Sequence, residues 1–513
     1  MTAEKNKLPS GWIQSSLGKM AQSMGGGTPS KADPDFWTDG TIPWVSPKDM
    51  KVFKLVSSED KLTLKALDRL SLIPAESVLV VVRSGILSRT FPVAISKQPV
   101  TINQDMRAFV PKEGILADYL AWQLIAKEQE ILSACSKDGT TVASIEGPVL
   151  ANFPLLLAPA AEQTRIVEKL EELLSDLDAG VAELKAAQRK LGQYRQSLLK
   201  AAVEGALTAS WRAQHTPTET GAQLLERILK ERRARWEAKQ LAKFEEQGKA
   251  PPKDWRKKYP EPVRPDTEGL PDLPNNWAWG SLEQISEIQG GIQKQPSRTA
   301  VSNKYPFLRV ANVARGLLKL DEVHEIELFE GELERLALAK GDVLIVEGNG
   351  SITEIGRCAL WDGSIPNAVH QNHLIRARPI VLRSHFVEAW LNSLRGIELM
   401  TKLAATTSGL YTLSVGKLSK IPIPIPPIQE QQAIIDFLAA GLDEQARQQE
   451  AVRQSLKQSA AQRKNILKAA FSGQLVPQDP DDEPAAVLLE RIRAERAATA
   501  PAARRGRQTK VTA

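Results

Sequence analysis

The sequence has few of the residues that build metal clusters, disulfide frameworks and membrane spans. Its 513 residues include only two cysteines, Cys135 and Cys358, which excludes a disulfide scaffold and a cysteine-ligated zinc cluster. No apolar run reaches the roughly 18 residues that a membrane span requires. The first residues, MTAEKNKLPSGW, lack the apolar segment of a signal peptide. We therefore expect a soluble, cytoplasmic protein whose cysteines are small buried apolar side chains.

Catalytic motifs are also missing. There is no G-x-x-x-x-G-K-[ST] loop for nucleotide hydrolysis, and the glycines at 25–27 do not follow a strand as a cofactor loop would. The N-P-P-[FY] loop of an adenine methyltransferase is absent. The E-x-K strings at 183–185 and 237–239 lie in helical patterns, where charged helix surface explains them better than a nuclease site. His370 and His373 form an H-x-x-H pair without a third metal ligand. We therefore expect no catalytic residue, metal or cofactor in this chain.

Length and composition limit the number of domains in this chain and the class of partner that it can bind. The chain is 42% hydrophobic and 25% charged, as in ordinary globular proteins, and its length predicts two to four domains. The net charge is +6 and the isoelectric point is about 9.0. This balance permits a nucleic acid partner without requiring one.

The most informative feature is an internal repeat with an offset of about 263–268 residues. The opening LPSGW (from Leu8) returns as LPNNW (from Leu273), and LLKAAVEGAL (198–207) returns as ILKAAFSGQL (466–475). Five further blocks recur in the same order: IPWVSPKDM with YPFLRVANV, ESVLVVVRSG with GDVLIVEGNG, INQDMRAF with HQNHLIRA, TTVASI with TTSGLYTL, and NFPLLLAPAAEQTRIV with KIPIPIPPIQEQQAII. The period is too long for a solenoid. The chain therefore consists of two related halves.

Each half begins with a mixed, loop-rich domain, which we place at 1–158 and 273–427. Short β-branched runs such as VLVVV and VLIV predict strands, and 116–135 and 384–400 predict helices between them. Glycines and prolines fill the connections. The predicted fold class is α+β, with two similar domains made of small mixed sheets and helices.

A long helix follows each domain, within 159–208 and 428–476. Apolar residues spaced by three and four predict a heptad seam; in the first copy they are Ile166, Leu170, Leu173, Leu177, Val181, Leu184, Leu191, Tyr194 and Leu198. The second copy has several polar or small residues in the seam. We expect the two helices to pair antiparallel as a coiled coil of about 60 Å, with the halves related by a pseudo-twofold axis. Gly205 and Gly473 are candidate helix stops.

Two segments lie outside the domains and long helices. Residues 209–272 contain a basic amphipathic helix and then a proline-rich basic stretch, which is either a solvated linker or a docking arm for a partner or for phosphates. Residues 477–513 contain a helix, whose LLERIRAER resembles LLERILKERR (224–233), and a basic tail that we expect to be disordered.

Polar and basic residues beside glycines form a candidate DNA-binding set in each domain. Arg, Lys, Asn and Gln side chains recognise base edges, while Ser, Thr and glycine amides suit phosphates. An ordinary loop residue is the alternative at any one position, but similar types recur in both halves. The first set is Thr28, Ser30, Trp44, Ser46, Lys48, Asp49, Arg83, Ser84, Arg89, Gln104, Thr140 and Thr141. The second set is Arg309, Asn312, Asn349, Ser351, Thr353, Arg357, Gln371, Asn372, Thr406, Thr407, Ser408 and Tyr411.

This ordered, duplicated pattern resembles the specificity subunit of type I restriction-modification enzymes. The resemblance covers nearly the whole chain and depends on L-P-x-x-W, GGGTPS, GTIPWVSPKDM, GDVLIVEGNG, the NQD and HQN stretches, proline before E-Q-x-x-I, and the LLKAA repeat. It implies that each domain recognises one half of a split double-stranded DNA target and that the long helices set the gap between the halves. Because the polar residues differ between the halves, we expect an asymmetric target.

The resemblance also implies partners and cofactors. One copy of this chain would assemble with two methylation subunits, which bind S-adenosylmethionine and methylate adenine at N6, and two restriction subunits, which use ATP and Mg²⁺. The LLER helices and the duplicated stretch that ends each long helix would dock the methylation subunits. The predicted docking residues are Leu198, Leu199, Lys200, Ala201, Ala202, Leu207, Ile466, Leu467, Lys468, Ala469, Ala470 and Leu475.

Two alternative functions compete with this interpretation. A self-contained restriction-methylation enzyme would require the cofactor and catalytic motifs that are missing here. A coiled-coil scaffold that does not bind DNA would explain the heptads but leaves the duplicated loop-rich domains without a purpose. Salt-dependent DNA binding by the complex with its methylation partner would separate the scaffold from the specificity subunit.

Overall fold

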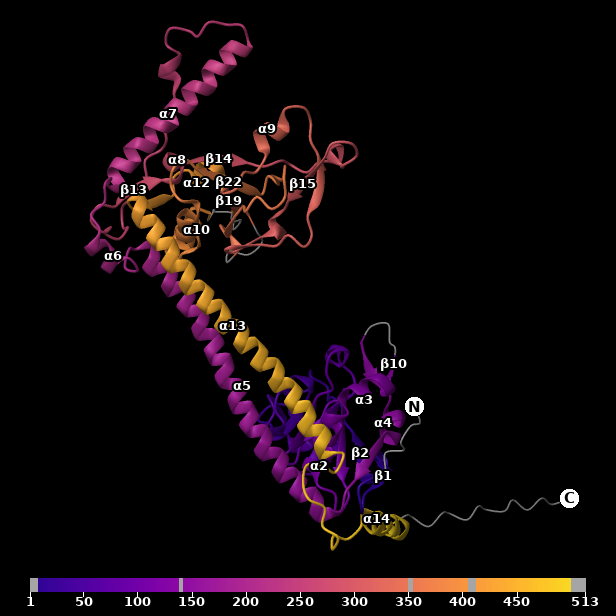
Figure 1. Ribbon diagram of the computed structural model, residues 1–513. Helices are drawn as coiled ribbons and strands as arrows, with labels where there is room; N and C mark the ends of the chain where they lie inside the picture. Colours follow the sequence, from indigo (N-terminus) through magenta and orange to yellow (C-terminus); the bar gives the residue numbers. More distant parts are fainter. Residues whose placement is uncertain (1–7, 138–141, 349–353, 405–411, 500–513) are drawn as a thin grey trace, which may run out of the picture. The chain divides into compact units, whose positions relative to one another are not determined.

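The computed structural model describes residues 8–137, 142–348, 354–404 and 412–499 (Figure 1). The chain divides into two compact units. Unit 1 comprises Met1–Lys185 and Arg453–Ala513, and unit 2 comprises Ala186–Val452. Each unit therefore contains one of the repeated domains together with parts of both long helices.

Unit 1 is built on a five-stranded sheet, in the order β2-β9-β6-β7-β4, and a three-stranded sheet, in the order β5-β3-β8. Two two-stranded sheets, β1-β12 and β10-β11, complete its described strands. The strands are β1 (Ile13–Ser16), β2 (Ala21–Gly25), β3 (Ile42–Val45), β4 (Lys54–Leu55), β5 (Asp60–Leu62), β6 (Ser77–Val81), β7 (Val93–Ser96), β8 (Thr101–Ile102), β9 (Met106–Pro111), β10 (Ser136–Lys137), β11 (Ser144–Ile145) and β12 (Pro154–Leu157). The helices are α1 (Leu17–Met20), α2 (Ala117–Ala126), α3 (Glu128–Cys135), α4 (Gly147–Asn152) and α14 (Ala485–Thr499).

Unit 2 has the corresponding four-stranded sheet β14-β22-β19-β20, three-stranded sheet β18-β15-β21 and two-stranded sheet β13-β23, with β16-β17 in addition. Its strands are β13 (Ala278–Ser281), β14 (Ser286–Gly290), β15 (Lys304–Leu308), β16 (Val313–Ala314), β17 (Leu317–Leu318), β18 (His324–Glu327), β19 (Val343–Val346), β20 (Cys358–Leu360), β21 (Val369–His370), β22 (Leu374–Pro379) and β23 (Pro422–Ile425). Its helices are α6 (Ala209–Gln214), α7 (Gly221–Glu246), α8 (Leu282–Ile285), α9 (Glu332–Leu336), α10 (Ser384–Asn392), α11 (Leu394–Ala404) and α12 (Val415–Leu418).

The repeat seen in the sequence extends to strand register. β3 pairs with β8 in parallel with Trp44 opposite Thr101, and β15 pairs with β21 in parallel with Phe307 opposite Val369. Val80 lies opposite Arg107 as Ile345 lies opposite Ile375 in the larger sheets. A one-residue slip in register would turn every side chain to the other face of the sheet. Because the two domains keep matching strand partners and registers, they share one fold. The α+β prediction with two similar domains is confirmed.

Two predicted helices are each broken in the structure. The segment 116–135 forms α2 and α3, and the segment 384–400 lies in α10 and α11. Between α10 and α11, Ser393 adopts an extended conformation and its hydroxyl donates a hydrogen bond to the Trp390 carbonyl. Gly396 then packs so closely that a Cβ atom there would lie 2.2 Å from the Trp390 carbonyl oxygen. This close approach, rather than helix propensity, decides the local structure.

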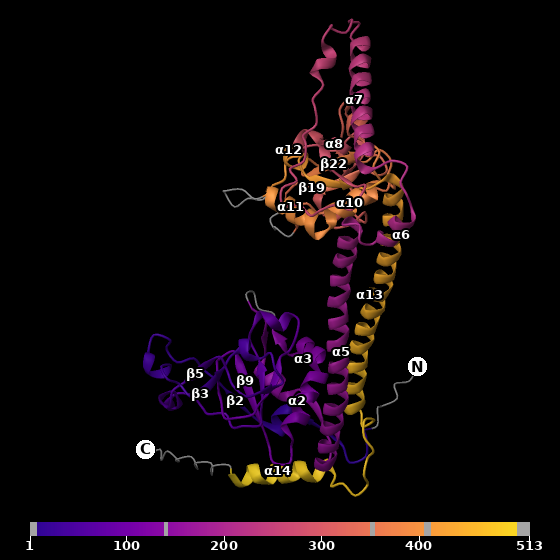
Figure 2. The same cartoon turned by 90° about the vertical axis from the view of Figure 1, so that its left-hand side faces the viewer.

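The two predicted long helices are α5 (Ala160–Val203) and α13 (Ile428–Ala470), and they lie side by side within each unit (Figures 1 and 2). In unit 1, Asp178 of α5 forms a 2.6 Å ion pair with Arg463 of α13. In unit 2, Leu198 packs on Gly441, where a Cβ atom would lie 2.6 Å from a Leu198 methyl carbon. Later residues of α5 thus meet earlier residues of α13, as expected for an antiparallel pair. Both helices end before a glycine with positive φ, Gly205 at 77° and Gly473 at 71°, which confirms the predicted stops.

The seam between these helices is less regular than the heptad pattern predicted. Tyr194 was expected in the seam, yet its side chain is 50% exposed. Burial is concentrated near the helix ends, where Ile166 and Leu170 join the core of unit 1 and Leu198 and Leu199 join the core of unit 2. The ends of each long helix therefore pack mainly on the domains, which relaxes the demand for a continuous apolar seam.

A tryptophan–glutamate pair fixes the start of each long helix to its domain. The Trp12 indole donates a 2.8 Å hydrogen bond to Glu162, and the Trp277 indole donates a 2.9 Å hydrogen bond to Glu430. All four side chains are buried, so each polar group depends on its partner. This contact explains why L-P-x-x-W recurs with E-Q at the two helix starts.

Unit 2 carries a buried carboxyl where unit 1 is apolar. At the repeat offset of 268, Glu388 of α10 occupies the position of Leu120 of α2. Glu388 lines a cavity of about 130 Å³ together with Arg195, His385 and Asn392. Burial raises the pKa of the Glu388 carboxyl to about 7, and the Arg195 guanidinium offsets part of that increase.

We expect unit 2 to lose stability as the pH rises from about 4.5 to 7. The folded protein holds the Glu388 proton more tightly than the unfolded chain, so the neutral carboxyl is favoured below this window and ionisation costs up to about 3 kcal/mol above it. Glu388→Gln imitates the neutral form. Urea unfolding at pH 5 and pH 8 should show the variant more stable than wild type at pH 8 and nearly equal at pH 5. A constant difference across this range would contradict the assignment.

Candidate nucleic-acid interface

The candidate residues of unit 1 converge where β3 and β8 end. These strands run in parallel, so their carboxyl ends lie at one edge, and the Asn103 amide donates a 2.9 Å hydrogen bond to the Val45 carbonyl. The turn Pro47–Asp49 after β3 is closed by the Asp49 carboxylate, which accepts 2.9 Å bonds from the amide and hydroxyl of Ser46. The SPKD and NQD stretches, about 55 residues apart in the sequence, are therefore neighbours.

The glycine-rich loop lies against the same edge. Gly27 donates a 2.9 Å hydrogen bond to the Ile102 carbonyl, and the Trp44 indole donates a 2.9 Å bond to the Gly27 carbonyl. The Thr28 hydroxyl contacts the Gln104 amide oxygen. At Gly26, a Cβ atom would lie 2.0 Å from the Ile102 carbonyl oxygen, so only glycine fits here.

Two arginines lie in this neighbourhood, Arg83 after β6 and Arg107 in β9. The Arg83 backbone amide donates a 3.2 Å hydrogen bond to the Asp105 carbonyl, and the Arg83 side chain is exposed. Arg107, which the sequence-based set missed, is half-buried in β9, with its guanidinium 3.6 Å from where a Gly25 Cβ atom would lie. Its place two residues after NQD was the available signal. Arg89 lies further along, after the 3-10 turn Gly85–Ser88.

Several members of this first set form bonds within the domain, and some of those are also exposed. Trp44, Ser46 and Asp49 are engaged in the bonds above. The Lys48 ammonium pairs with Asp60 at 3.0 Å and Glu59 at 3.2 Å. The exposed members are Thr28, Ser30, Lys48, Arg83, Arg89 and Gln104, and Ser84 is half-buried.

Unit 2 repeats the edge with different side chains. Gln371 and Asn372 follow β21 and are half-buried, and their backbone amides donate hydrogen bonds to the carbonyls of Leu308 and Ile292. Gly291 matches Gly26, because a Cβ atom there would lie 2.2 Å from the His370 carbonyl oxygen. The backbone of the two edges is therefore alike while the polar groups differ.

Two predicted members of the second set serve the local structure. The Asn312 side chain is buried, accepts the Arg309 amide at 2.8 Å, and donates to the carbonyls of Lys319 and Glu322. The Arg357 guanidinium donates to the carbonyls of Val313 and Val310 at 2.6 and 2.9 Å. These groups could reach a base only if their turns opened. Arg309 pairs with Glu322 at 3.1 Å and is half-buried.

Nine predicted DNA-binding residues lie outside the described part of the chain. They are Thr140, Thr141, Asn349, Ser351, Thr353, Thr406, Thr407, Ser408 and Tyr411. Their proposed roles stay predictions.

The predicted docking stretches contribute to the cores of the units. Leu198, Leu199 and Ala202 are buried in unit 2, and Leu467 and Ala470 are buried in unit 1. The lysines Lys200 and Lys468 are exposed; Ala201, Leu207, Ile466, Ala469 and Leu475 are half-buried. The repeated residues at 198–207 and 466–475 therefore stabilise this chain itself. The end of α5 packs on the second domain, and the end of α13 packs on the first.

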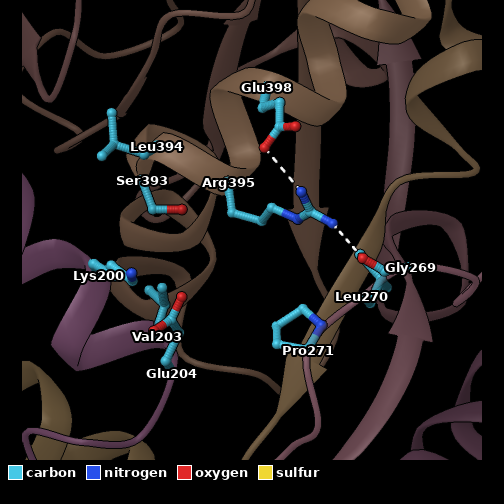
Figure 3. A pocket seen from close by; sticks show the side chains of 10 residues that line it. All are labelled: Lys200, Val203, Glu204, Gly269, Leu270, Pro271, Ser393, Leu394, Arg395 and Glu398. Atoms are coloured by element: carbon cyan, nitrogen blue, oxygen red, sulfur yellow. Dashed lines mark hydrogen bonds and ion pairs between the residues drawn. The ribbon is translucent and has the colours of Figure 1, made fainter.

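The end of α5 also borders the pocket shown in Figure 3, within unit 2. Its volume is about 520 Å³. The Arg395 guanidinium spans it from α11, donating a 2.6 Å bond to the Gly269 carbonyl and pairing with Glu398 at 2.8 Å. Lys200 and Glu204 line the α5 side (Figure 3). The linker near Gly269 is thus held against the domain.

The described residues contain no group of three or more His, Cys, Asp and Glu side chains that could hold a metal ion. His370 is buried, and burial lowers the pKa of its imidazole to about 4, while His373 is exposed. Among the helices of the described residues, none is long and apolar enough to span a membrane.

Comparison with known proteins identifies the class. The type I restriction modification DNA specificity domain matches residues 9–186 and 274–457, one match on each repeated domain, and the chain belongs to this family. Membership makes it a specificity component of a type I restriction system, which is a non-catalytic role. Each match therefore includes one of the two edges described above, where β3 and β8 end in the first domain and where β15 and β21 end in the second.

Individual relatives carry the same description. The chain is 25% identical to the EcoKI specificity subunit of Escherichia coli strain K12, over 96% of this chain and 97% of the relative. It is 42% identical to the EcoR124I/EcoR124II specificity subunit of Escherichia coli, over 36% of this chain and 46% of the relative. A solved chain from a study of assembly and conformational transition of the type I R-M system has a TM-score of 0.64 and 18% identity, covering 91% of this chain and 99% of that one. That structural likeness shows the fold.

Proposed function

We propose that each domain recognises one half of an asymmetric, two-part DNA target, and that α5 and α13 set the spacing between the halves. The observation that supports this most is the duplicated edge: Gly26 and Gly291 hold the same backbone, while Gln104 and Asn372 differ at matching positions. Because the two edges have the same backbone and different polar side chains, we expect them to bind DNA in the same geometry and to recognise different base sequences.

In the same proposal, partner subunits carry out the methylation and restriction of DNA. One copy of this chain binds two methylation subunits, which hold S-adenosylmethionine and methylate adenine at N6, and two restriction subunits, which use ATP and Mg²⁺. The exposed Lys200 and Lys468, at equivalent places on the two long helices, support two identical docking positions. The complex would act on DNA in the cytoplasm.

The proposal is tested by co-expressing the chain with its methylation subunit and sequencing the host DNA for N6-methyladenine. We expect a new two-part motif with a fixed gap, methylated on both strands. Replacing residues 1–158 with the domain of another family member should change one half of the motif, and replacing residues 273–427 should change the other. A palindromic motif would exclude the asymmetric target. Absence of methylation from an assembled, cofactor-binding complex would favour the scaffold.

A further inference from the structure

The segment that the sequence left as either a solvated linker or a docking arm forms a folded projection in unit 2. Beyond Ile228, the last α7 residue in the core of the unit, α7 continues to Glu246, and the chain then returns alongside it (Figures 1 and 2). We name residues 233–261 the arm. The inner turns of α7 contact the sheet through a 2.8 Å bond from Arg232 to the Ser286 carbonyl and a 3.3 Å ion pair between Lys239 and Glu287.

A small aromatic core holds the arm together. The rings of Trp236 and Trp255 stack with centroids 5.8 Å apart, and Tyr259 meets Trp236 edge-on at 5.4 Å. Phe244 meets Trp255 at 6.1 Å, and the Arg233 guanidinium lies 5.4 Å from the Tyr259 ring centroid. Trp255 is buried although it lies in the proline-rich segment. The returning chain is therefore packed on α7.

Among the residues that the structure describes, unit 1 has no counterpart of the arm. The related helix α14 carries the same LLER letters, and its Leu488 and Leu489 are buried in the core of unit 1 as Leu224 is in unit 2. The described part of α14 has 15 residues, whereas α7 has 26. No α7 residue beyond Ile228 belongs to the buried core of unit 2, and this outer part of the helix is therefore free to bind a partner.

The tip of the arm is basic. Residues 243–258 carry six cations and three anions. Arg256 and Lys257 pair with Glu237 and Asp254 at 3.2 and 2.9 Å. Within the described part of the chain, the remaining four cations have exposed side chains with no ion pair or hydrogen bond: Lys243, Lys249, Lys253 and Lys258. The tip also carries the exposed Glu245 and Glu246.

We propose that the arm tip binds the phosphate backbone of duplex DNA beside the target. The inference rests on the proposed function, which brings DNA to the domains. Flexible lysines act as point charges and suit phosphates without selecting bases. The arm's aromatic rings pack against one another, so they do not offer the stacking platform that single-stranded nucleic acid uses. Charge and packing together favour duplex phosphates.

The test uses the complex with the methylation subunit and duplexes that carry the methylated motif with long or short flanks. The arm variant is Lys249→Gln, Lys253→Gln and Lys258→Gln. The matched control neutralises three exposed lysines of the domain in unit 2, Lys304, Lys402 and Lys420. With long flanks, the arm variant should bind about 10- to 100-fold more weakly at low salt, and the slope of log affinity against log salt should fall by about 2 to 3.

Binding to short-flank duplexes, the control variant and assembly with the methylation subunit decide whether the arm binds DNA. Short-flank duplexes should bind wild type and arm variant equally, and the control should match wild type on both. An unchanged salt slope on long duplexes, or loss of methylation-subunit assembly, would overturn the proposal; the latter would make the arm a protein-docking surface. Failure of the proposed function appears separately, as equal wild-type affinity for duplexes with and without the motif, and the salt slopes still test the arm.

Discussion

Replacing Glu430 by glutamine should destabilise unit 2 by about 3–5 kcal/mol, because it breaks a buried charge pair. Glu430 is 1% exposed. Its carboxylate accepts from the Trp277 indole at 2.9 Å, the Thr208 hydroxyl at 2.8 Å and the Arg212 guanidinium at 2.5 Å. A glutamine amide keeps only one oxygen acceptor, so its NH2 group would direct hydrogens at the donors on one side, and Arg212 would lose its counter-ion. Urea unfolding at pH 7 measures the loss.

The repeat supplies the control at Glu162. Its Oε2 atom accepts from Trp12, but its buried Oε1 atom has no partner among the described residues, and burial raises the pKa of its carboxyl. The positions that match Thr208 and Arg212 hold Val476 and Pro480. Glu162→Gln should therefore cost about 1 kcal/mol or less. Equal losses at Glu162 and Glu430 would show that the additional donors contribute nothing.

The second large effect is expected at Gly291. A Cβ atom there would lie 2.2 Å from the His370 carbonyl oxygen, inside van der Waals contact with rigid backbone. Gly291→Ala should therefore displace the loop from β21, cost more than about 4 kcal/mol, and abolish recognition of one half of the target. Unfolding curves and DNA binding by the complex with its methylation subunit measure the two consequences.

Gly290 is the matched control for Gly291. An added Cβ atom at Gly290 meets nothing within 4 Å, so Gly290→Ala should change the free energy of unfolding by less than about 1 kcal/mol and leave DNA binding unchanged. If Gly291→Ala behaved like Gly290→Ala, the loop would not depend on its close contact with β21.

The repeat made much of this architecture predictable. Because SVLVV and DVLIV recur with turn signals around them, the central strands β6 and β19 followed from the pattern. The long helices and their stops at Gly205 and Gly473 were equally visible, since helix ends are marked by local chemistry.

Other features depend on contacts that no local pattern records. Tyr194 continues the heptad spacing but is exposed, because the apolar stripe near the helix ends packs on a domain. Asn312 has a side chain of the type that contacts bases, yet the backbone groups of Arg309, Lys319 and Glu322 occupy its polar atoms. The proline-rich segment is compatible by sequence with a solvated linker or a docking arm, and the 5.8 Å between the ring centroids of Trp236 and Trp255 shows that it is folded.

The division of the chain also determines the order in which its parts can finish folding during synthesis. Unit 2 is one continuous segment, so the ribosome delivers all of it before the second half of α13 appears. The first domain leaves the ribosome earliest, but its core also needs Leu467, Phe471 and Leu488. The domain that is synthesised first is therefore completed last, and a nascent chain must carry its unfinished apolar surface until α14 has been synthesised.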